Sequence, residues 1–374
     1  MRDEFPQDHD LIYLNHAGIA PWPRRTAAAV QTFAEENAQR GALHYRRWQA
    51  VEGRLRERLR GLIGAASAAD IALLKNTSEG LSLVAYGLDW RAGDNVVLTD
   101  QEFPSNRIVW ESLRRFGVEA RVAALDGQGT PEQAIMDRAD PRTRLIAVSS
   151  VQYASGLRMD LEALGAFAAG RGILLCVDAI QSLGVLPFDI SAVRADFVVA
   201  DGHKWLLAPE GVALFYCRPE LREQLRLTQY GWHMVEDSGD FDSTHWTPAA
   251  SARRFECGSP NSLGVHALEA SLSLIQDIGV PRIARRVAEL TALLMARIAA
   301  CPELAAITPA DPARRAGIVT FRHRRADPYD LWQTLMQQRV VCACRGGGIR
   351  FSPHFYNTSE ELERALDLAI RLGG

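Results

Sequence analysis

Residues 173–181 read ILLCVDAIQ, and residues 196–205 read DFVVADGHKW. Each stretch contains a short apolar run that is followed by polar side chains. Further runs of this kind occur at residues 95–99, 120–125 and 145–148. Segments with helical spacing of apolar residues, such as 161–170, lie between them. This alternation is typical of a largely parallel sheet buried between helices. The sequence therefore predicts an α/β fold.

The second half of the chain indicates a smaller unit. Residues 211–216 continue the sheet as an antiparallel strand, and residues 231–262 read as a loop. Two strong helices and a short α+β unit follow, and the last helix, at residues 359–372, is capped by Thr358 or Ser359. We predict an N-terminal arm (1–15), a large α/β domain (16–262) and a small C-terminal α+β domain (263–374), against which the N-terminal segment is also a candidate to pack.

Composition excludes several classes of partner. The 374 residues contain 42 Lys+Arg and 45 Asp+Glu, and the net charge of -3 gives no reason to expect nucleic acid or an anionic membrane as a partner. No run reaches the roughly 18 apolar residues of a membrane span. The six cysteines have no CxxC pair and no zinc-like spacing, so we expect reduced thiols, a cytoplasmic location and no metal site.

Only two of the basic residues are lysines, Lys75 and Lys204, and arginine cannot serve as an amine nucleophile. Lys204 directly follows a predicted buried strand, where desolvation favours the neutral amine that Schiff-base chemistry needs. The alternative is a surface lysine whose stem lies along apolar side chains. Asp178 ends another apolar run, at the sheet edge where α/β proteins bind ligands. A buried carboxylate needs a cationic partner, and the pyridinium nitrogen of pyridoxal phosphate is one.

Residues 75–80 read KNTSEG and form another junction between a strand and a helix. Small hydroxyl side chains and free backbone N–H groups at a helix N-terminus suit a phosphate group. The alternative is an ordinary helix cap. Lys75 precedes this junction, so we interpret it as structural.

The motifs at residues 178–182 and 196–211, together with YLNHAG at 13–18 and RFSPHFYNT at 350–358, resemble the class V aminotransferase family of fold-type I pyridoxal-phosphate enzymes. That family also includes cysteine desulfurases, selenocysteine lyases, and kynureninase-like and isopenicillin N epimerase-like members. The resemblance covers almost the whole chain. It implies a large domain with a mostly parallel sheet of the seven-stranded type, plus a smaller C-terminal α+β domain.

The resemblance also implies roles for individual residues at the cofactor. Lys204 would form the Schiff base and then move the substrate's α-proton, and Asp178 would pair with the pyridinium nitrogen. The other implied cofactor contacts are Gln181 at the ring's 3-hydroxyl, Phe103 stacked on the ring, Tyr153 near the ring oxygen, and Thr77, Ser78 and His203 at the phosphate. Ser259 belongs to a loop, residues 258–261, that would reach the phosphate of a neighbouring subunit, which implies a homodimer with a shared active site.

Arg350 is the residue that the resemblance places at the substrate's α-carboxylate, where a guanidinium fork donates two parallel hydrogen bonds. His16 is a weaker candidate for the substrate site. Further weak candidates are Trp232, His233 and His354; each of these four residues could equally be a packed or interface residue.

Three departures from the family pattern bear on the reaction. Cysteine desulfurases usually carry a histidine where this chain has Phe103, and a nucleophilic cysteine on a mobile loop well before the arginine. Here Cys342 and Cys344 lie only eight and six residues before Arg350, which favours buried or incidental thiols over the alternative, a persulfide role for Cys344. Asp201 replaces a serine found in many relatives, and we expect it to point away from the phosphate or to meet an arginine.

We therefore predict a pyridoxal-phosphate enzyme that acts on a small amino acid, with transamination as the first hypothesis. The alternative on the same scaffold is a cysteine desulfurase, a C–S or C–Se lyase, or an amino-acid epimerase. A non-catalytic cofactor-binding regulator is the hypothesis from another class. The presence of both Lys204 and Arg350 argues against it.

Overall fold

The computed structural model of the chain describes residues 2–127 and 129–373, so Met1 and Gly374, the outer limits of the predicted arm and small domain, lie outside the described residues. Its larger sheet has seven strands in the order β2-β8-β7-β6-β5-β3-β4. The strands are β2 (Ile71–Leu74), β3 (Asn95–Thr99), β4 (Glu119–Ala123), β5 (Thr143–Ser149), β6 (Leu174–Asp178), β7 (Phe197–Asp201) and β8 (Ala213–Cys217). Only β8 runs antiparallel to its neighbours β2 and β7. The predicted α/β fold and the antiparallel strand are confirmed.

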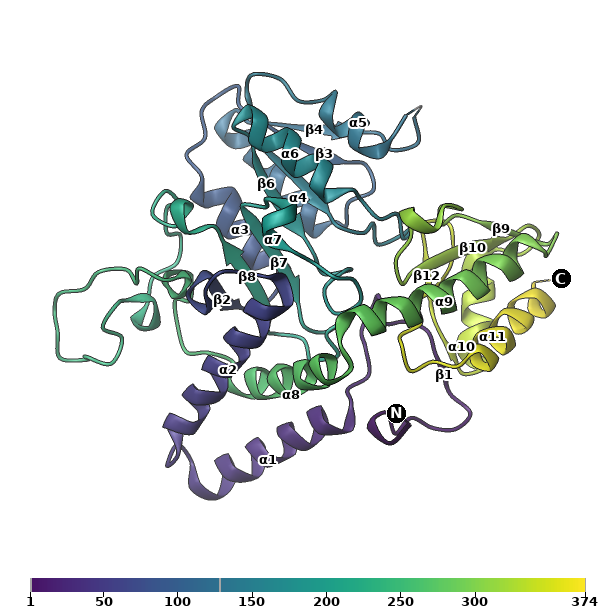
Figure 1. Cartoon of the computed structure of the whole chain (residues 1–374), viewed down its shortest axis with the longest axis horizontal. Helices are drawn as coiled ribbons and strands as arrows, with labels where there is room; N and C mark the ends of the chain where they lie inside the picture. Colours follow the sequence, from purple (N-terminus) through teal and green to yellow (C-terminus); the bar gives the residue numbers. More distant parts are fainter. Residues whose placement is uncertain (1, 128, 374) are drawn as a thin grey trace.

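The central strands are buried on both faces, which explains their unbroken apolar sequences. On β6, Leu175 and Val177 belong to one apolar core, whereas Cys176 belongs to the core on the opposite face. The first core includes side chains from α2 (Tyr45–Ile63), α6 (Leu161–Arg171) and α8 (Ser262–Ile278), and the second includes side chains from α3 (Thr77–Gly87) and α4 (Ser105–Glu111). Figure 1 shows these helices around the sheet. The sheet is therefore held rigidly, and its strand ends are fixed in position.

The helices follow local sequence signals. Asn76 caps α3 by accepting a hydrogen bond from the Glu79 N–H at 2.9 Å, and Thr358 caps α11 in a capping box with Glu361. The predicted Thr358 cap is thus confirmed. The helices are α1 (Arg24–Arg40), α2 (Tyr45–Ile63), α3 (Thr77–Gly87), α4 (Ser105–Glu111), α5 (Pro131–Met136), α6 (Leu161–Arg171), α7 (Ile190–Val193), α8 (Ser262–Ile278), α9 (Val280–Ala299), α10 (Pro328–Gln337) and α11 (Ser359–Leu372). None of the helices in the described part of the chain is long and apolar enough to cross a membrane.

A second, four-stranded antiparallel sheet has the order β12-β13-β10-β9 and packs with α9, α10 and α11 around its own apolar core. Its strands are β9 (Leu304–Ala306), β10 (Val319–His323), β12 (Ala343–Arg345) and β13 (Gly348–Phe351). Helices α8 and α9 follow one another from the larger sheet toward this smaller one (Figure 1). The division of the chain at residues 15 and 262 stays a prediction.

The N-terminal segment joins the C-terminal part of the chain. Strand β1 (Ile12–Tyr13) pairs in parallel with β11 (Val340–Val341), and Asn15 forms a bridge with Ser352. Beyond this point the segment turns toward the larger sheet, where the Ala20 N–H donates to the carbonyl oxygen of His203 at 2.8 Å. The N-terminal segment therefore contacts both sheets.

Candidate active site

A cavity of about 360 Å³ lies where the strand ends of the larger sheet meet the N-terminal segment and the smaller sheet. Most of the residues that the resemblance implies as site residues line it. These are Thr77, Ser78, Phe103, Tyr153, Asp178, Gln181, His203, Lys204 and Arg350. The structure therefore brings together residues that are up to 273 positions apart in the sequence, from Thr77 to Arg350.

The base of the cavity is formed by two adjacent strands. Asp178 is the last residue of β6, and β7 ends at Asp201, three residues before Lys204. Because the two strands run parallel, their carboxyl ends lie at the same sheet edge. The side chains of Asp178 and Lys204 are both buried, and the Lys204 amine lies 5.5 Å from the centre of the Phe103 ring.

A tight turn holds Lys204 in place. The Leu207 N–H donates to the Lys204 carbonyl oxygen at 3.0 Å, and the Ala208 N–H donates to the Gly202 carbonyl oxygen at 3.0 Å. Leu207 has φ of +60°, in the left-handed region that non-glycine residues rarely adopt. Such strain persists only where the surrounding structure imposes it, and it is common at functional sites.

Burial shifts the protonation of both groups. It lowers the pKa of Lys204, which favours the neutral amine, and it raises the pKa of Asp178. The positive charge of Lys204 opposes the shift at Asp178. A carboxyl group of this kind ionises fully at neutral pH only beside a cation. A protonated pyridine nitrogen would supply that cation.

The opposite end of the cavity suits a phosphate group. Thr77 is the first residue of α3, and its hydroxyl oxygen is buried with no hydrogen-bond partner. The first N–H groups of a helix have no partner within the helix, and the helix dipole favours an anion there. The Ser78 hydroxyl donates to the Ser105 hydroxyl at 2.9 Å. The unpaired hydroxyl at a helix start and the buried Asp178 together fit pyridoxal phosphate.

Asp201 lines the cavity, and its Oδ1 lies 3.0 Å from Nδ1 of His203, so its charged neighbour is a histidine and not the expected arginine. Its direction relative to a bound phosphate stays a prediction. As the last residue of β7 it is close to the turn that carries His203, so the histidine becomes its partner. An acid at Nδ1 leaves Nε2 of His203 available for a ligand.

Arg350 lies on β13 and is buried, with 3% of its surface exposed. Its Nη1 donates to the Tyr153 carbonyl oxygen at 2.8 Å and its Nη2 to Oδ1 of Asn15 at 3.3 Å, whereas its Nε is buried without a partner. Burial lowers the pKa of Arg350 to about 10, and the neighbouring charge of Arg345 acts in the same direction. A buried guanidinium with an unpaired donor provides a binding site for a carboxylate.

The strand register directs the nearby cysteines away from this arginine. On the paired strands β12 and β13, Ala343 lies opposite Arg350 and Cys344 lies opposite Ile349. Residues opposite one another in an antiparallel pair share a face, and successive residues alternate. Cys344 therefore faces the same side as Ile349, which is fully buried in the core of the smaller sheet. Burial raises the pKa of Cys344 and raises that of Cys342 to about 12.

Five residues implied or suggested by sequence do not line the cavity: His16, Ser259, Trp232, His233 and His354. Trp232 lines a separate hollow formed by residues 230–247. His16 is fully buried, with Nδ1 2.8 Å from the Ser352 carbonyl oxygen and Nε2 2.6 Å from the Tyr356 hydroxyl. Burial lowers its pKa well below the usual value. Ser259 lines a separate hollow of about 220 Å³ together with Lys75 and Glu79. Of the weaker candidates, His354 is fully buried in the packing around Trp205.

Sequence reasoning missed four polar side chains that line the cavity: Asn15, Asn76, Ser105 and Arg345. Asn15 belongs to the quoted segment 13–18, Asn76 to the quoted segment 75–80, and Ser105 lies two residues after Phe103, so their positions could have been inferred from these neighbours. Arg345 shares the face of β12 that Ala343 and Arg350 occupy. The three glycines that follow Arg345 in the sequence do not indicate on which face of the sheet its side chain lies.

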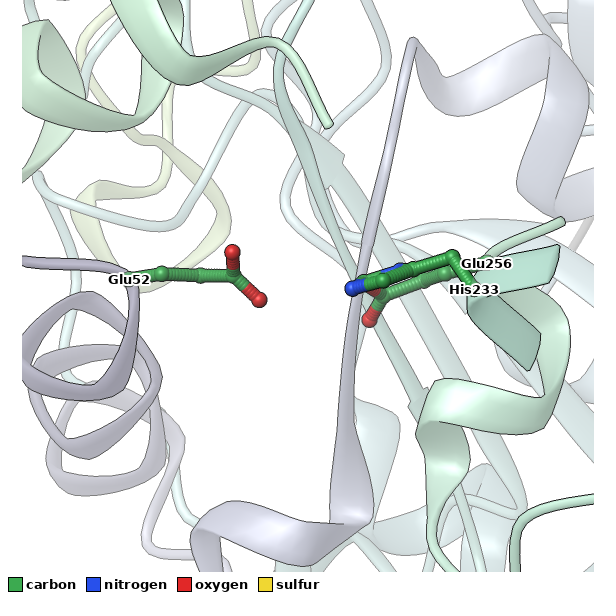
Figure 2. A group of neighbouring side chains, drawn as sticks. All are labelled: Glu52, His233 and Glu256. Atoms are coloured by element: carbon green, nitrogen blue, oxygen red, sulfur yellow. The ribbon is translucent and has the colours of Figure 1, made fainter. Parts of the chain in front are cut away.

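The carboxylates of Glu52 and Glu256 and the imidazole of His233 form a second polar cluster, drawn in Figure 2. These groups could in principle hold a metal ion. However, the Arg56 guanidinium already bridges the two acids, with Nη1 2.6 Å from Glu256 and Nη2 2.6 Å from Glu52. Glu256 also accepts the Leu73 N–H at 2.9 Å. The cluster therefore ties helix α2 to strand β2 as a buried ionic network.

Comparison with known proteins agrees with this geometry. The sequence pattern of the aminotransferase class-V family matches residues 12–365. A probable cysteine desulfurase from Methanothermobacter thermautotrophicus is 33% identical over 97% of this chain and 95% of its own length. The uncharacterized aminotransferase YcbU from Bacillus subtilis is 34% identical over 82% of this chain and 80% of its own length.

Solved structures share the fold over nearly the full length. The apo structure of a cysteine desulfurase from Thermococcus onnurineus NA1 has a TM-score of 0.90 and 25% identity, covering 100% of this chain and 97% of that one. The structure of a C-DES mutant, with glycine covalently linked to its PLP cofactor, has a TM-score of 0.91 and 24% identity, with 99% of both chains covered. With Lys204 and Asp178 buried in one cavity, these matches show that the chain belongs to the class V aminotransferase family and is a pyridoxal-phosphate-dependent enzyme.

Proposed function

We propose that this enzyme cleaves the C–S bond of cysteine or a related sulfur amino acid by β-elimination, without a persulfide on its own cysteines. One observation carries the choice of route: among the described residues, no cysteine lines the cavity that contains Lys204 and Arg350. The names of the relatives support a sulfur amino acid as substrate, because most of those compared are cysteine desulfurases. The transamination that we predicted first has less support.

The chain's own residues account for the steps. Arg350 binds the α-carboxylate of the substrate, and the Lys204 amine, whose pKa burial lowers to about 8, accepts the proton from Cα. Asp178 would hold the positive charge on the ring nitrogen of the cofactor. Pyridoxal phosphate supplies the electron sink for the pair released at Cα. The Cβ–S bond then breaks, the sulfur leaves as a thiolate that takes up a proton, and water converts the remaining fragment to pyruvate and ammonia. With cysteine, the balance is cysteine and water to pyruvate, ammonia and hydrogen sulfide, with no external oxidant or reductant.

The products formed from cysteine test this proposal. We expect the enzyme to release pyruvate and sulfide in equal amounts, at a rate that Cys344→Ala changes by less than about twofold, because Cys344 faces away from Arg350. The measurement is a parallel assay of pyruvate, alanine and sulfide over one time course. Alanine as the main product, with activity lost in Cys344→Ala, would show a desulfurase that uses a protein persulfide.

Transamination is the second candidate function, and the likeness to YcbU favours it. It predicts a stoichiometric pyridoxamine form when an amino acid is added without a keto acid, and no release of sulfide from cysteine. The absorption spectrum of the cofactor, together with the product assay described above, therefore separates the two reactions. The homodimer and the role of Ser259 across a subunit boundary also stay proposals, which rest on the family resemblance.

Arg350 should be critical for any amino-acid substrate. We expect Arg350→Ala to lower kcat/KM by roughly 10²- to 10⁴-fold, because two hydrogen bonds to a charged group, at about 1.5–3 kcal/mol each, together contribute about 3–6 kcal/mol. Arg350→Lys keeps the charge but loses the planar fork, so it should recover only part of the loss. Steady-state kinetics with cysteine measure both.

Arg345→Ala is the matched control for this prediction, since Arg345 lines the same cavity but is exposed to solvent. We expect it to change kcat/KM by less than the Arg350 variants do. An equal loss in both would mean that the general positive charge of the cavity, and not a specific fork at Arg350, binds the substrate.

A further inference from the structure

The side-chain amide of Gln181 is held on both sides. Gln181 is 2% exposed and lines the cavity beside Lys204. Its Oε1 accepts a hydrogen bond from the indole N–H of Trp205 at 2.8 Å. Its Nε2 donates to the Ala17 carbonyl oxygen at 3.0 Å. The amide therefore has one N–H left for a ligand.

These two partners fix which end of the amide is which. An indole N–H can only donate, and a backbone carbonyl oxygen can only accept. If the Gln181 amide were turned over, both hydrogen bonds would be replaced by contacts between like groups. The group that Gln181 can offer to a ligand is therefore a donor.

Trp205 is itself held without freedom to move. It is fully buried, and a side chain at Gly317 would have its Cβ 2.3 Å from the Trp205 ring. Nδ1 of His354 accepts the Phe355 N–H at 2.9 Å, so Nε2 carries the proton and donates to the Trp205 carbonyl oxygen at 3.2 Å. Because Trp205 follows Lys204 directly, the same turn positions both side chains.

We propose that Trp205 is a positioning residue, which locks the Gln181 amide so that it donates a hydrogen bond to the ring oxygen of pyridoxal phosphate. This inference depends on the cofactor and not on which reaction the enzyme catalyses. A donor withdraws negative charge from that oxygen, and a less negative oxygen holds a proton on the neighbouring lysine nitrogen less tightly. The lock therefore lowers the pH at which the bound cofactor changes its visible absorption.

Other charged groups also act on Lys204, namely Asp178 on β6, Asp201 on β7, Arg345 on β12 and Arg350 on β13, and His203 lines the same cavity. None of these has a hydrogen bond or ring contact with Trp205 in the described part of the chain; the titratable groups that do contact it are His16 and His354. A shift in the spectral midpoint that follows a change at Trp205, and that does not add to the shift of Gln181→Ala, therefore reports on Gln181.

The test is a pH titration of the visible band of the holoenzyme. We expect Trp205→Phe to raise the midpoint by roughly one pH unit, as the loss of one hydrogen bond to a charged group would. Replacement of Trp205 by 3-benzothienylalanine keeps the ring and puts sulfur in place of the N–H, so it removes the donor without a cavity. This replacement should raise the midpoint by the same amount as Trp205→Phe. It also keeps the proposal testable if the phenylalanine variant does not fold.

Trp110→Phe is the matched control, because Trp110 is also fully buried and its indole N–H donates to the side-chain oxygen of Asn106 at 2.9 Å. It should lower stability similarly and leave the midpoint unchanged. The double variant Trp205→Phe/Gln181→Ala should shift the midpoint no further than Gln181→Ala alone. An unshifted midpoint in the Trp205 variants, or shifts that add, would overturn the proposal.

Discussion

Lys204→Ala should abolish the visible band of covalently bound cofactor and reduce turnover by roughly 10³-fold or more, because it removes both the attachment point and the base that accepts the Cα proton. The absorption spectrum of protein supplied with pyridoxal phosphate measures the first effect. Product formation from cysteine measures the second. A band of normal intensity in this variant would show that the cofactor is attached elsewhere.

The scarcity of lysine makes a sharp control possible. Lys75 is the only other lysine in the chain, and its side chain is 74% exposed beside Glu79. Lys75→Ala should leave spectrum and turnover unchanged. Borohydride reduction of the holoenzyme, followed by peptide mass analysis, should place the cofactor on the peptide that contains Lys204 and leave the Lys75 peptide unmodified.

Asp178→Asn is the change with the next largest expected effect. Removing one partner of a buried ion pair costs about 3–5 kcal/mol, which corresponds to a loss of activity between roughly 10²- and 10⁴-fold. The asparagine variant should still bind the cofactor through Lys204 and the phosphate-binding end of the cavity. The expected result is therefore a protein that keeps its visible band and loses turnover.

Asp196→Asn separates this effect from general destabilisation. Asp196 is also a buried carboxyl group next to a strand of the larger sheet, and burial raises its pKa too. However, it precedes β7 and pairs with Arg218 at 2.8 Å, away from the cavity. The Asp196→Asn variant should be less stable than the parent enzyme and should keep its turnover. Equal losses of turnover in both variants would contradict a specific role for Asp178.

The sequence predicts best where a strand is long, apolar and flanked by polar residues. Strand β3 occupies the predicted residues 95–99, and β6 and β7 end at the predicted polar positions. The two-residue strands β1 and β11 could not be predicted, because strands so short are formed by pairing across more than 300 residues and have no periodicity of their own.

The site shows the same contrast at the level of side chains. Asp178 and Lys204 follow from their places at strand ends. The face that Cys344 occupies follows from the register of β12 against β13, and the partner of Asp201 follows from the turn after β7. The sequence indicated His16 as a weaker candidate for the substrate site. Only the packed structure shows that both its ring nitrogens are already bonded.

The pairing of the N-terminal segment with the C-terminal sheet also governs when the site can form during biosynthesis. Asn15 contacts Arg350, 335 residues later, and Ala17 contacts Gln181, 164 residues later. The ribosome releases residues 12–20 long before their partners exist, so this segment must wait unpaired while the larger sheet folds. Contacts between residues so far apart in sequence form late, because the chain must lose the entropy of loop closure before it gains any favourable contact. The nascent chain can therefore bury its main core well before it becomes an enzyme.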